Sequence, residues 1–178
     1  MRIIYVYHNC FIVDLGEITL VFDVPEVEFL GEKGFQIVLE NITGKKTIVF
    51  ESHGHWDHYS GEIFKLVDKA SDIKYFLSHD IVEKNPQIMS EDTARKIVVV
   101  KPHERHTLEN CTVTTFRSTD IGVAYLVEVE GVKIYHSGDL ACWTWNHLPD
   151  YIRNAIRETF LSEISKVAEH YPDVAFID

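Results

Sequence analysis

Short runs of apolar, β-branched residues open the chain and set the first limit on its fold. Three of them follow one another at 3–7 (IIYVY), 10–15 (CFIVDL) and 18–23 (ITLVFD). Runs of this length and composition, separated by a few turn residues, predict β-strands. The Leu15-Gly16 pair suits a tight turn between the second and third runs. The chain is therefore expected to begin with an antiparallel meander.

Similar runs recur along the chain and alternate with helical segments. Further strands are predicted at 47–50, 73–78, 96–101, 111–116, 121–129, 132–137 and 174–178. The Glu130-Gly131 pair suits a hairpin turn. A helix over 61–70 is expected to have Ser60 as its N-cap. The side chains expected on its buried face are Ile63, Phe64 and Val67.

A longer amphipathic helix is predicted over about 150–170, ended by Pro172. Its apolar positions at helical spacing are Ile152, Ile156, Phe160, Ile164 and Val167. Two mixed β-sheets packed face to face, with helices on the outer faces, would bury all of these apolar faces. The expected fold class is therefore α/β, a four-layer αββα sandwich. The chain length of 178 residues suits a single domain.

Composition and net charge limit the binding partners and the cellular location that we expect for this protein. The net charge of -11 disfavours nucleic acid over most of the surface. No apolar run is long enough to span a membrane, and the N-terminus has no signal-peptide pattern, so we expect a cytoplasmic protein. The odd set Cys10, Cys111 and Cys142 is read as reduced thiols, with a metal-ligand role for Cys142 as the alternative.

The sequence ESHGHWDHYSGE at 51–62 concentrates metal-ligand residue types in one loop. His53 and His55 have the i, i+2 spacing that lets both side chains project the same way from an extended segment. Asp57 and His58 could hold a second ion. Imidazole and carboxylate are ligands for zinc, manganese and iron. The loop therefore predicts a metal site between a strand and a helix.

Three segments of the chain carry a family resemblance. The H-x-H-x-D-H pattern after an apolar strand resembles the signature of the metallo-β-lactamase superfamily. The sequence VKIYHSGDL at 132–140 resembles its later strand ending in Gly-Asp, which implies that Asp139 bridges two metals. The sequence YHNCFIVD at 7–14 resembles the start of the branch that includes the L-ascorbate-6-phosphate lactonases. The αββα fold that this resemblance implies agrees with the fold expected from the strand pattern.

The resemblance implies a metal-dependent hydrolase. It would use a metal-bound hydroxide on a small ester, lactone or phosphoester substrate. Asp57 would orient the hydroxide or accept its proton. Zn²⁺ is the expected ion, one or two per chain, with Mn²⁺ or Fe as alternatives. The competing interpretations are a non-catalytic or metal-depleted relic of the fold and a mononuclear iron dioxygenase.

The sequence departs from the family pattern at two places. The usual third histidine is absent from 114–126, where Asp120 could replace it as a ligand. Alternatively, Asp120 belongs only to a turn before the next strand. The usual final histidine is also absent, so we expect the domain to lack its C-terminal segment. The apolar strand at 174–178 should then dock beside the strands at 111–137, and its exposed edge could pair with another copy of the chain.

Other residues are candidates for the substrate pocket or for supporting the ligands. His8 follows the first strand and is expected to support the site. His136, which precedes Ser137-Gly138, is expected either to support the site or to bond within the core. The tryptophans near the two motifs, which could line a substrate cleft or simply pack, are Trp56, Trp143 and Trp145.

Overall fold

The computed structural model of the protein describes residues 1–177. They form two compact units, the first spanning Met1–Val100 and the second beginning at Lys101. The last residue of the strand predicted at 174–178, Asp178, lies outside the described residues. We describe each unit by itself.

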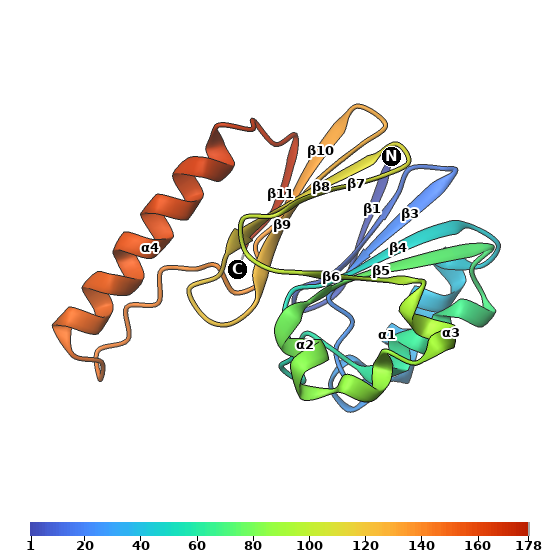
Figure 1. Ribbon diagram of the computed structural model, residues 1–178, viewed down its shortest axis with the longest axis horizontal. Coiled ribbons are helices and arrows are strands. Elements are labelled where there is room, and N and C mark those ends of the chain that lie inside the picture. Colours follow the sequence, from blue (N-terminus) through green and yellow to red (C-terminus); the bar gives the residue numbers. More distant parts are fainter. Residues whose placement is uncertain (178) are drawn as a thin grey trace. The chain divides into compact units, whose positions relative to one another are not determined.

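The first unit is built on a six-stranded mixed sheet (Figure 1). Its strands are β1 (Arg2–Tyr7), β2 (Cys10–Asp14), β3 (Ile18–Phe22), β4 (Lys46–Glu51), β5 (Asp72–Ser78) and β6 (Ile97–Val100), and they lie in this order. The first three strands pair antiparallel, which confirms the predicted meander. From β3 to β6 the strands are parallel. The carboxyl ends of β3, β4 and β5 therefore meet at one edge of the sheet.

Helices cover one face of this sheet (Figure 1). They are α1 (Val27–Ile42), η1 (Gly61–Asp68), α2 (His79–Lys84), η2 (Pro86–Ile88) and α3 (Glu91–Ala94). Of these, only η1 was predicted. Helix α1 was not predicted from the sequence. Gly31, at φ 78°, interrupts its regular helical geometry.

The helix predicted over 61–70 is a 3₁₀-helix, and one part of its predicted buried face is wrong. Ser60 caps it as expected, because its side chain accepts a hydrogen bond from the Glu62 amide. Residues at i and i+3 share a face in a 3₁₀-helix. Ile63 and Leu66 are therefore buried, whereas Val67 is 37% exposed.

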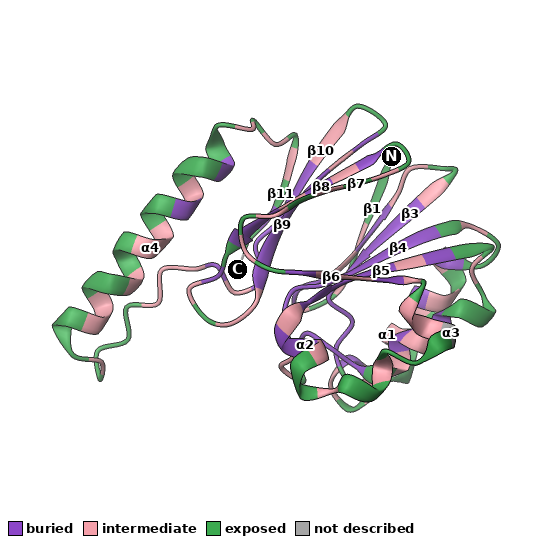
Figure 2. Ribbon diagram, viewed as in Figure 1, coloured by how far each residue is buried: buried purple, intermediate pink, exposed green. Residues whose placement is uncertain are grey.

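The central strands of the first unit are buried on both faces (Figure 2). One face carries Val21, Val49 and Tyr75, which pack in a core with side chains from the covering helices. The other face carries three stacked rings at paired positions on β3, β4 and β5. They are Phe22, Phe50 and Phe76. Phe22 is the last residue of β3, Phe50 lies one residue before the end of β4, and Phe76 lies two residues before the end of β5.

The second unit contains a five-stranded mixed sheet. Its strands are β7 (Arg105–Leu108), β8 (Cys111–Arg117), β9 (Val123–Val129), β10 (Val132–His136) and β11 (Val174–Phe176), in the order β11-β10-β9-β8-β7. Glu130 and Gly131 form the predicted β9–β10 turn, at φ 51° and 78°. Strand β11 pairs parallel with β10, which confirms the predicted docking of this segment. Strand β7 was not predicted.

Helix α4 (Asp150–Ala168) contacts its own sheet through its C-terminal half. The predicted stripe residues Phe160, Ile164 and Val167 pack in one cluster with buried side chains of the sheet. Most of the helix surface is exposed or half-buried (Figure 2). The helix ends before Pro172, and Tyr171 at φ 51° takes the chain out of helical geometry.

Two mixed sheets with helices confirm the α/β fold class predicted from the sequence. Among residues 1–177, no helix has both the length and the apolar character that a membrane-spanning segment needs.

Candidate metal centre

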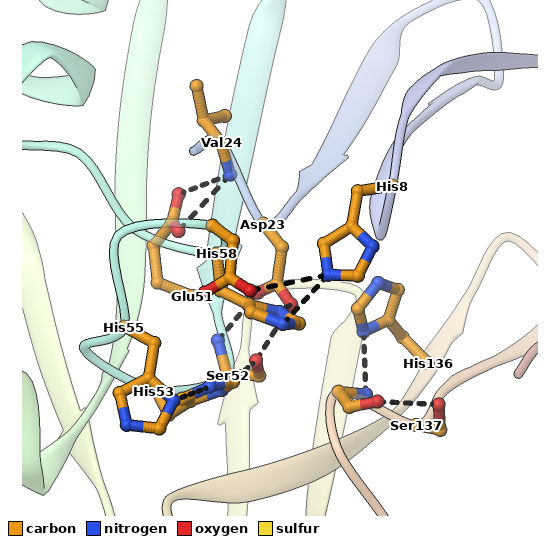
Figure 3. A network of polar contacts seen from close by, with 12 residues as sticks. His8, Asp23, Val24, Glu51, Ser52, His53, His55, His58, His136 and Ser137 are labelled. Carbon is orange, nitrogen blue, oxygen red and sulfur yellow. Dashed lines mark hydrogen bonds and ion pairs between the residues drawn. The ribbon is translucent and has the colours of Figure 1, made fainter. Parts of the chain in front are cut away.

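The loop after β4 brings His53 and His55 together, as the sequence predicted. His53 Nε2 lies 3.0 Å from His55 Nδ1, and the two rings are nearly perpendicular (Figure 3). His53 is fully buried, and His55 is half-buried. Ligand nitrogens of two imidazoles this close can bind the same ion.

A chain of hydrogen bonds fixes the tautomer of His53. The Ser52 hydroxyl donates to Asp23 Oδ2 at 2.7 Å, so its proton is committed to that carboxylate. His53 Nδ1, 3.0 Å from the same hydroxyl oxygen, must then donate its proton to Ser52 (Figure 3). His53 Nε2 is left with its lone pair, the form in which imidazole binds a metal.

Asp23 orients His58 in the same way. His58 Nδ1 donates to Asp23 Oδ2 at 2.8 Å, and both side chains are almost completely buried. The second carboxylate oxygen accepts a hydrogen bond from the Ser52 amide at 2.7 Å. One buried carboxylate thus directs the Nε2 atoms of two histidines, which is the usual arrangement behind metal-bound imidazoles.

Gly54 allows the loop to lie close to helix α2. Its amide donates to Asp80 Oδ2 at 2.9 Å. A Cβ atom at this position would come within 3.2 Å of the same oxygen. A glycine between the two histidines therefore lets the loop backbone bond directly to the carboxylate, and this bond holds the turn of the loop.

A second group of ligand atoms lies beside the first loop. His8, Asp57 and His58 each offer one ligand atom, and these atoms lie within 4.8 Å of one another. His8 Nε2 is 3.2 Å from His58 Nε2 and 3.8 Å from Asp57 Oδ2. The structure thus groups Asp57 and His58 as the sequence suggested and adds His8, which we expected only to support the site.

In the second unit, Asp120 and Asp139 each offer a carboxylate oxygen, and these two oxygens lie within 4.8 Å of each other. Thr119 links their loops, because its hydroxyl lies 2.9 Å from the Asp139 carbonyl oxygen and 2.7 Å from that of Ala141. Asp120 is exposed, and its amide donates to the Ser118 hydroxyl.

His136 is buried and supports the backbone before Asp139. Its Nδ1 atom accepts a hydrogen bond from the Gly138 amide at 3.2 Å, and the Ser137 hydroxyl donates to the Gly138 carbonyl (Figure 3). Gly138 has a φ of 48°, which L-residues adopt at a cost in energy. His136 therefore stabilises the turn at Gly138, and it joins neither of the ligand groups found among the described residues.

The three tryptophans lie at the surface or partly buried. Trp56 is 57% exposed and meets the ring of Phe29 edge-on at 4.7 Å. In the second unit, Trp143 lies 5.5 Å from Trp145, whose ring stacks on His147. Exposed aromatic faces of this kind can contact a substrate.

All three cysteines are free thiols, and Cys10 and Cys111 are buried. Cys142 is partly buried and belongs to neither of the ligand groups formed by residues 1–177. Burial raises the pKa of the Cys111 thiol to about 12. Burial, with a smaller contribution from Glu51, also raises the pKa of Cys10 well above its usual value. The two buried thiols are therefore held in their neutral form.

Glu51 was not predicted as part of the centre. It is fully buried at the end of β4 and accepts hydrogen bonds from the Val24 amide (Figure 3). Burial, and then the charge of Asp23, raise the pKa of its carboxyl well above the usual value. Glu51 thus fastens the segment after β3 to β4.

Three further residues of the centre, Asp23, Ser52 and Asp80, were not predicted from the sequence. Asp23 and Ser52 directly follow the ends of β3 and β4, and Asp80 lies two residues after the end of β5, where polar groups from neighbouring strands meet. That position is the signal that could have found them, since sites of parallel sheets form at the carboxyl ends of the strands.

The donor set fits a divalent metal. His53 and His58 have their tautomers fixed by the Asp23 network, and both present Nε2 toward a second imidazole. Neutral imidazoles with nearby carboxylates suit zinc, manganese and iron. The centre can therefore hold a metal through residues of the first unit alone.

A comparison with known protein families identifies the family to which the chain belongs. Residues 2–150 match the family described as the beta-lactamase superfamily domain. The chain belongs to this family. The superfamily predicted from the sequence motifs is thereby confirmed. No curated protein matches the sequence at a significant level.

Solved metallo-β-lactamases share the fold of this family member. A HARLDQ-motif mutant from Cronobacter sakazakii (Enterobacter sakazakii) is 13% identical, with a TM-score of 0.58 over 98% of this chain and 75% of that one. SMB-1, in a complex with mercaptoacetic acid, is 11% identical, with a TM-score of 0.55 over 98% and 78%. MEM-A1, a subclass B3 enzyme from a soil metagenome library, is 12% identical, with a TM-score of 0.54 over 99% and 78%.

Proposed function

We propose that this protein is a metal-dependent hydrolase of a small ester, lactone or phosphoester. The observation that carries the proposal is the His53–Ser52–Asp23–His58 network, which aims two imidazole Nε2 atoms outward from one buried carboxylate. Membership of the β-lactamase superfamily domain supports the reaction class. The resemblance of residues 7–14 to the lactonase branch supports the substrate class.

The proposed ion is Zn²⁺, with Mn²⁺ and Fe as alternatives. His53 and His55 would hold one ion, and Asp57 and His58 would contribute to a second. Asp139 enters this proposal from the Gly-Asp motif of the family, and Asp120 enters it as the proposed replacement for the histidine that the family pattern has at 114–126. When bound, such ions lower the pKa of a water molecule and polarise a substrate oxygen.

The residues of the chain have distinct roles in this proposal. Asp23 and Ser52 keep the Nδ1 protons of His53 and His58 in place, so that Nε2 stays available. Asp57, whose side chain is 31% exposed, is the proposed proton acceptor for water. The half-exposed ring of Trp56 offers an apolar contact to a substrate. Trp143 and Trp145 are proposed to do the same from the second unit.

Hydrolysis assays with defined metal content test this proposal. Tag-free protein would be stripped with a chelator, reloaded with Zn²⁺ or Mn²⁺, and assayed on p-nitrophenyl acetate, a γ-lactone and bis-p-nitrophenyl phosphate. We expect metal-dependent turnover of at least one probe and its loss in His55→Ala. His106→Ala is the control, because His106 also neighbours a carboxylate, with Nε2 3.0 Å from Glu104 Oε2. Turnover that is unchanged by metal removal, or absent with every metal, would contradict the proposal.

A further inference from the structure

The histidine at the β1–β2 turn lies beside the loop that carries the proposed metal ligands. His8 and Asn9 form this turn, between the paired residues Tyr7 and Cys10. His8 has a φ of 48°, in the left-handed region that a residue with a Cβ adopts at a cost in energy. A histidine in such a conformation at a tight turn points to a role for its side chain.

The His8 ring is held in place by its neighbours. It meets the Phe29 ring edge-on, with centroids 5.9 Å apart, and the His58 ring at 4.8 Å. Helix α1 contributes Phe29, and the loop after β4 contributes His58. Two segments distant in the sequence thus contact the His8 ring, and Figure 3 shows His58 beside it.

The ligand atoms of His8, Asp57 and His58 lie close to the separations that one ion requires. With metal–ligand distances of roughly 2.0–2.1 Å, ligand atoms of a tetrahedral zinc site lie about 3.3 Å apart. His8 Nε2 lies 3.2 Å from His58 Nε2 and 3.8 Å from Asp57 Oδ2. The His58 tautomer is set by Asp23, which leaves the His58 Nε2 lone pair directed toward His8. Small movements of these side chains would therefore let His8, Asp57 and His58 bind one ion together.

We propose that His8 is a metal ligand, and that His8, Asp57 and His58 form one metal site within the first unit. The motif resemblance supplied Asp57 and His58 for a second ion, and the structure places His8 of the β1–β2 turn beside them as a third ligand. The inference rests on the proposed function only in requiring that the loop after β4 binds metal.

Cobalt titration tests the site with a readout other than turnover. Metal-free protein would be titrated with Co²⁺, with bound metal counted by equilibrium dialysis and coordination followed by visible absorption. We expect His8→Asn and Asp57→Asn each to weaken binding of the same ion by about tenfold or more. Asparagine tolerates positive φ, so His8→Asn keeps the turn. His106→Asn is the matched control and should bind Co²⁺ like the wild type.

A second measurement uses the unaltered chain. The half-exposed His8 side chain should react with diethylpyrocarbonate, and Co²⁺ should protect it at least tenfold, as judged by mass spectrometry of its peptide. If Co²⁺ leaves this rate unchanged, or if His8→Asn binds Co²⁺ as tightly as the wild type, the inference is overturned. If only His55→Ala lowers Co²⁺ binding, the inference fails and the proposed function stands. Protection of His8 without turnover of any probe would support the site and contradict the hydrolase.

Discussion

His58 Nδ1 lies 2.8 Å from Asp23 Oδ2, although 34 residues of chain separate them and both side chains are 1% exposed. The same carboxylate accepts a hydrogen bond from the Ser52 hydroxyl, and this hydroxyl in turn accepts one from His53 Nδ1. Two ligand histidines therefore depend on one residue that follows β3. This dependence makes Asp23 the most informative position for mutation.

Asp23→Asn should weaken metal binding by about 10–100-fold while leaving the chain folded. The amide keeps the size of the carboxylate and tolerates the φ of 43° at this position. The single amide oxygen is a weaker acceptor than the carboxylate for the two hydrogen bonds from the Ser52 hydroxyl and His58 Nδ1. Competition with a chromogenic chelator measures the affinity, and exposed Asp68→Asn is the control. Unchanged affinity in Asp23→Asn would show that the network does not orient the ligands.

Gly131→Ala should lower the free energy of unfolding by about 1–2 kcal/mol. Gly131 has a φ of 78°, and a Cβ atom there would meet nothing within 4 Å, so the cost is that of the backbone alone. Gly61→Ala is a matched control, since the space around Gly61 is equally open and no positive φ is needed. Urea unfolding of both variants measures the difference. Equal stability would argue against the positive φ in the β9–β10 turn.

Asp14 should make stability depend on pH in the acid range. The Lys45 side chain, and to a smaller extent the Gly16 amide and Arg2, hold the pKa of Asp14 below its usual value. A lowered pKa means that the stabilisation is complete above the unfolded-state pKa and is lost as the pH falls through the folded-state pKa. Asp14→Asn should therefore cost up to about 1 kcal/mol at pH 7 and progressively less below pH 4. Urea unfolding at pH 7 and pH 3 checks this sign.

Native thiol labelling should distinguish the three cysteines. Cys10 and Cys111 are buried with raised pKa values, so they should not react with Ellman's reagent in the folded chain. Cys142 is partly exposed and should react. The expected stoichiometry is one thiol per chain in buffer and three in denaturant. Cys142→Ser should abolish the native reaction.

Strand β11 lies at the edge of its sheet and should permit weak self-association. Sedimentation of the wild-type chain over a range of concentrations would reveal it. Ala175 is exposed on this edge strand, and Ala175→Lys should reduce association, because a charge on an edge strand opposes pairing. A monomer at all concentrations would contradict this prediction.

The sequence predicted most strands because their apolar runs are short and their turns are marked. The β9–β10 turn at Glu130-Gly131 is the clearest example. Helix α1, whose geometry Gly31 interrupts, was not predicted, and Val67 was assigned to the wrong face because a 3₁₀-helix was read with α-helical spacing.

The loop motif indicated His53, His55, Asp57 and His58, since local spacing carries their relationship. Asp23 and His8 approach the loop only through tertiary structure, from β3 and from the β1–β2 turn. No spacing in the sequence encodes that approach. The sequence analysis named His8 only as a supporting residue, and Asp23 could be recognised only once the strand order was known.

The stacked rings of Phe22, Phe50 and Phe76 lie directly beneath the segments that carry Asp23 and the histidine loop. These rings are fully buried, whereas His55 and Asp57 of the loop are partly exposed. Substitutions of His55 or Asp57 should change metal preference with little effect on melting temperature, whereas substitutions of the rings should do the opposite. A chain with this separation can diverge in chemistry without first losing its fold.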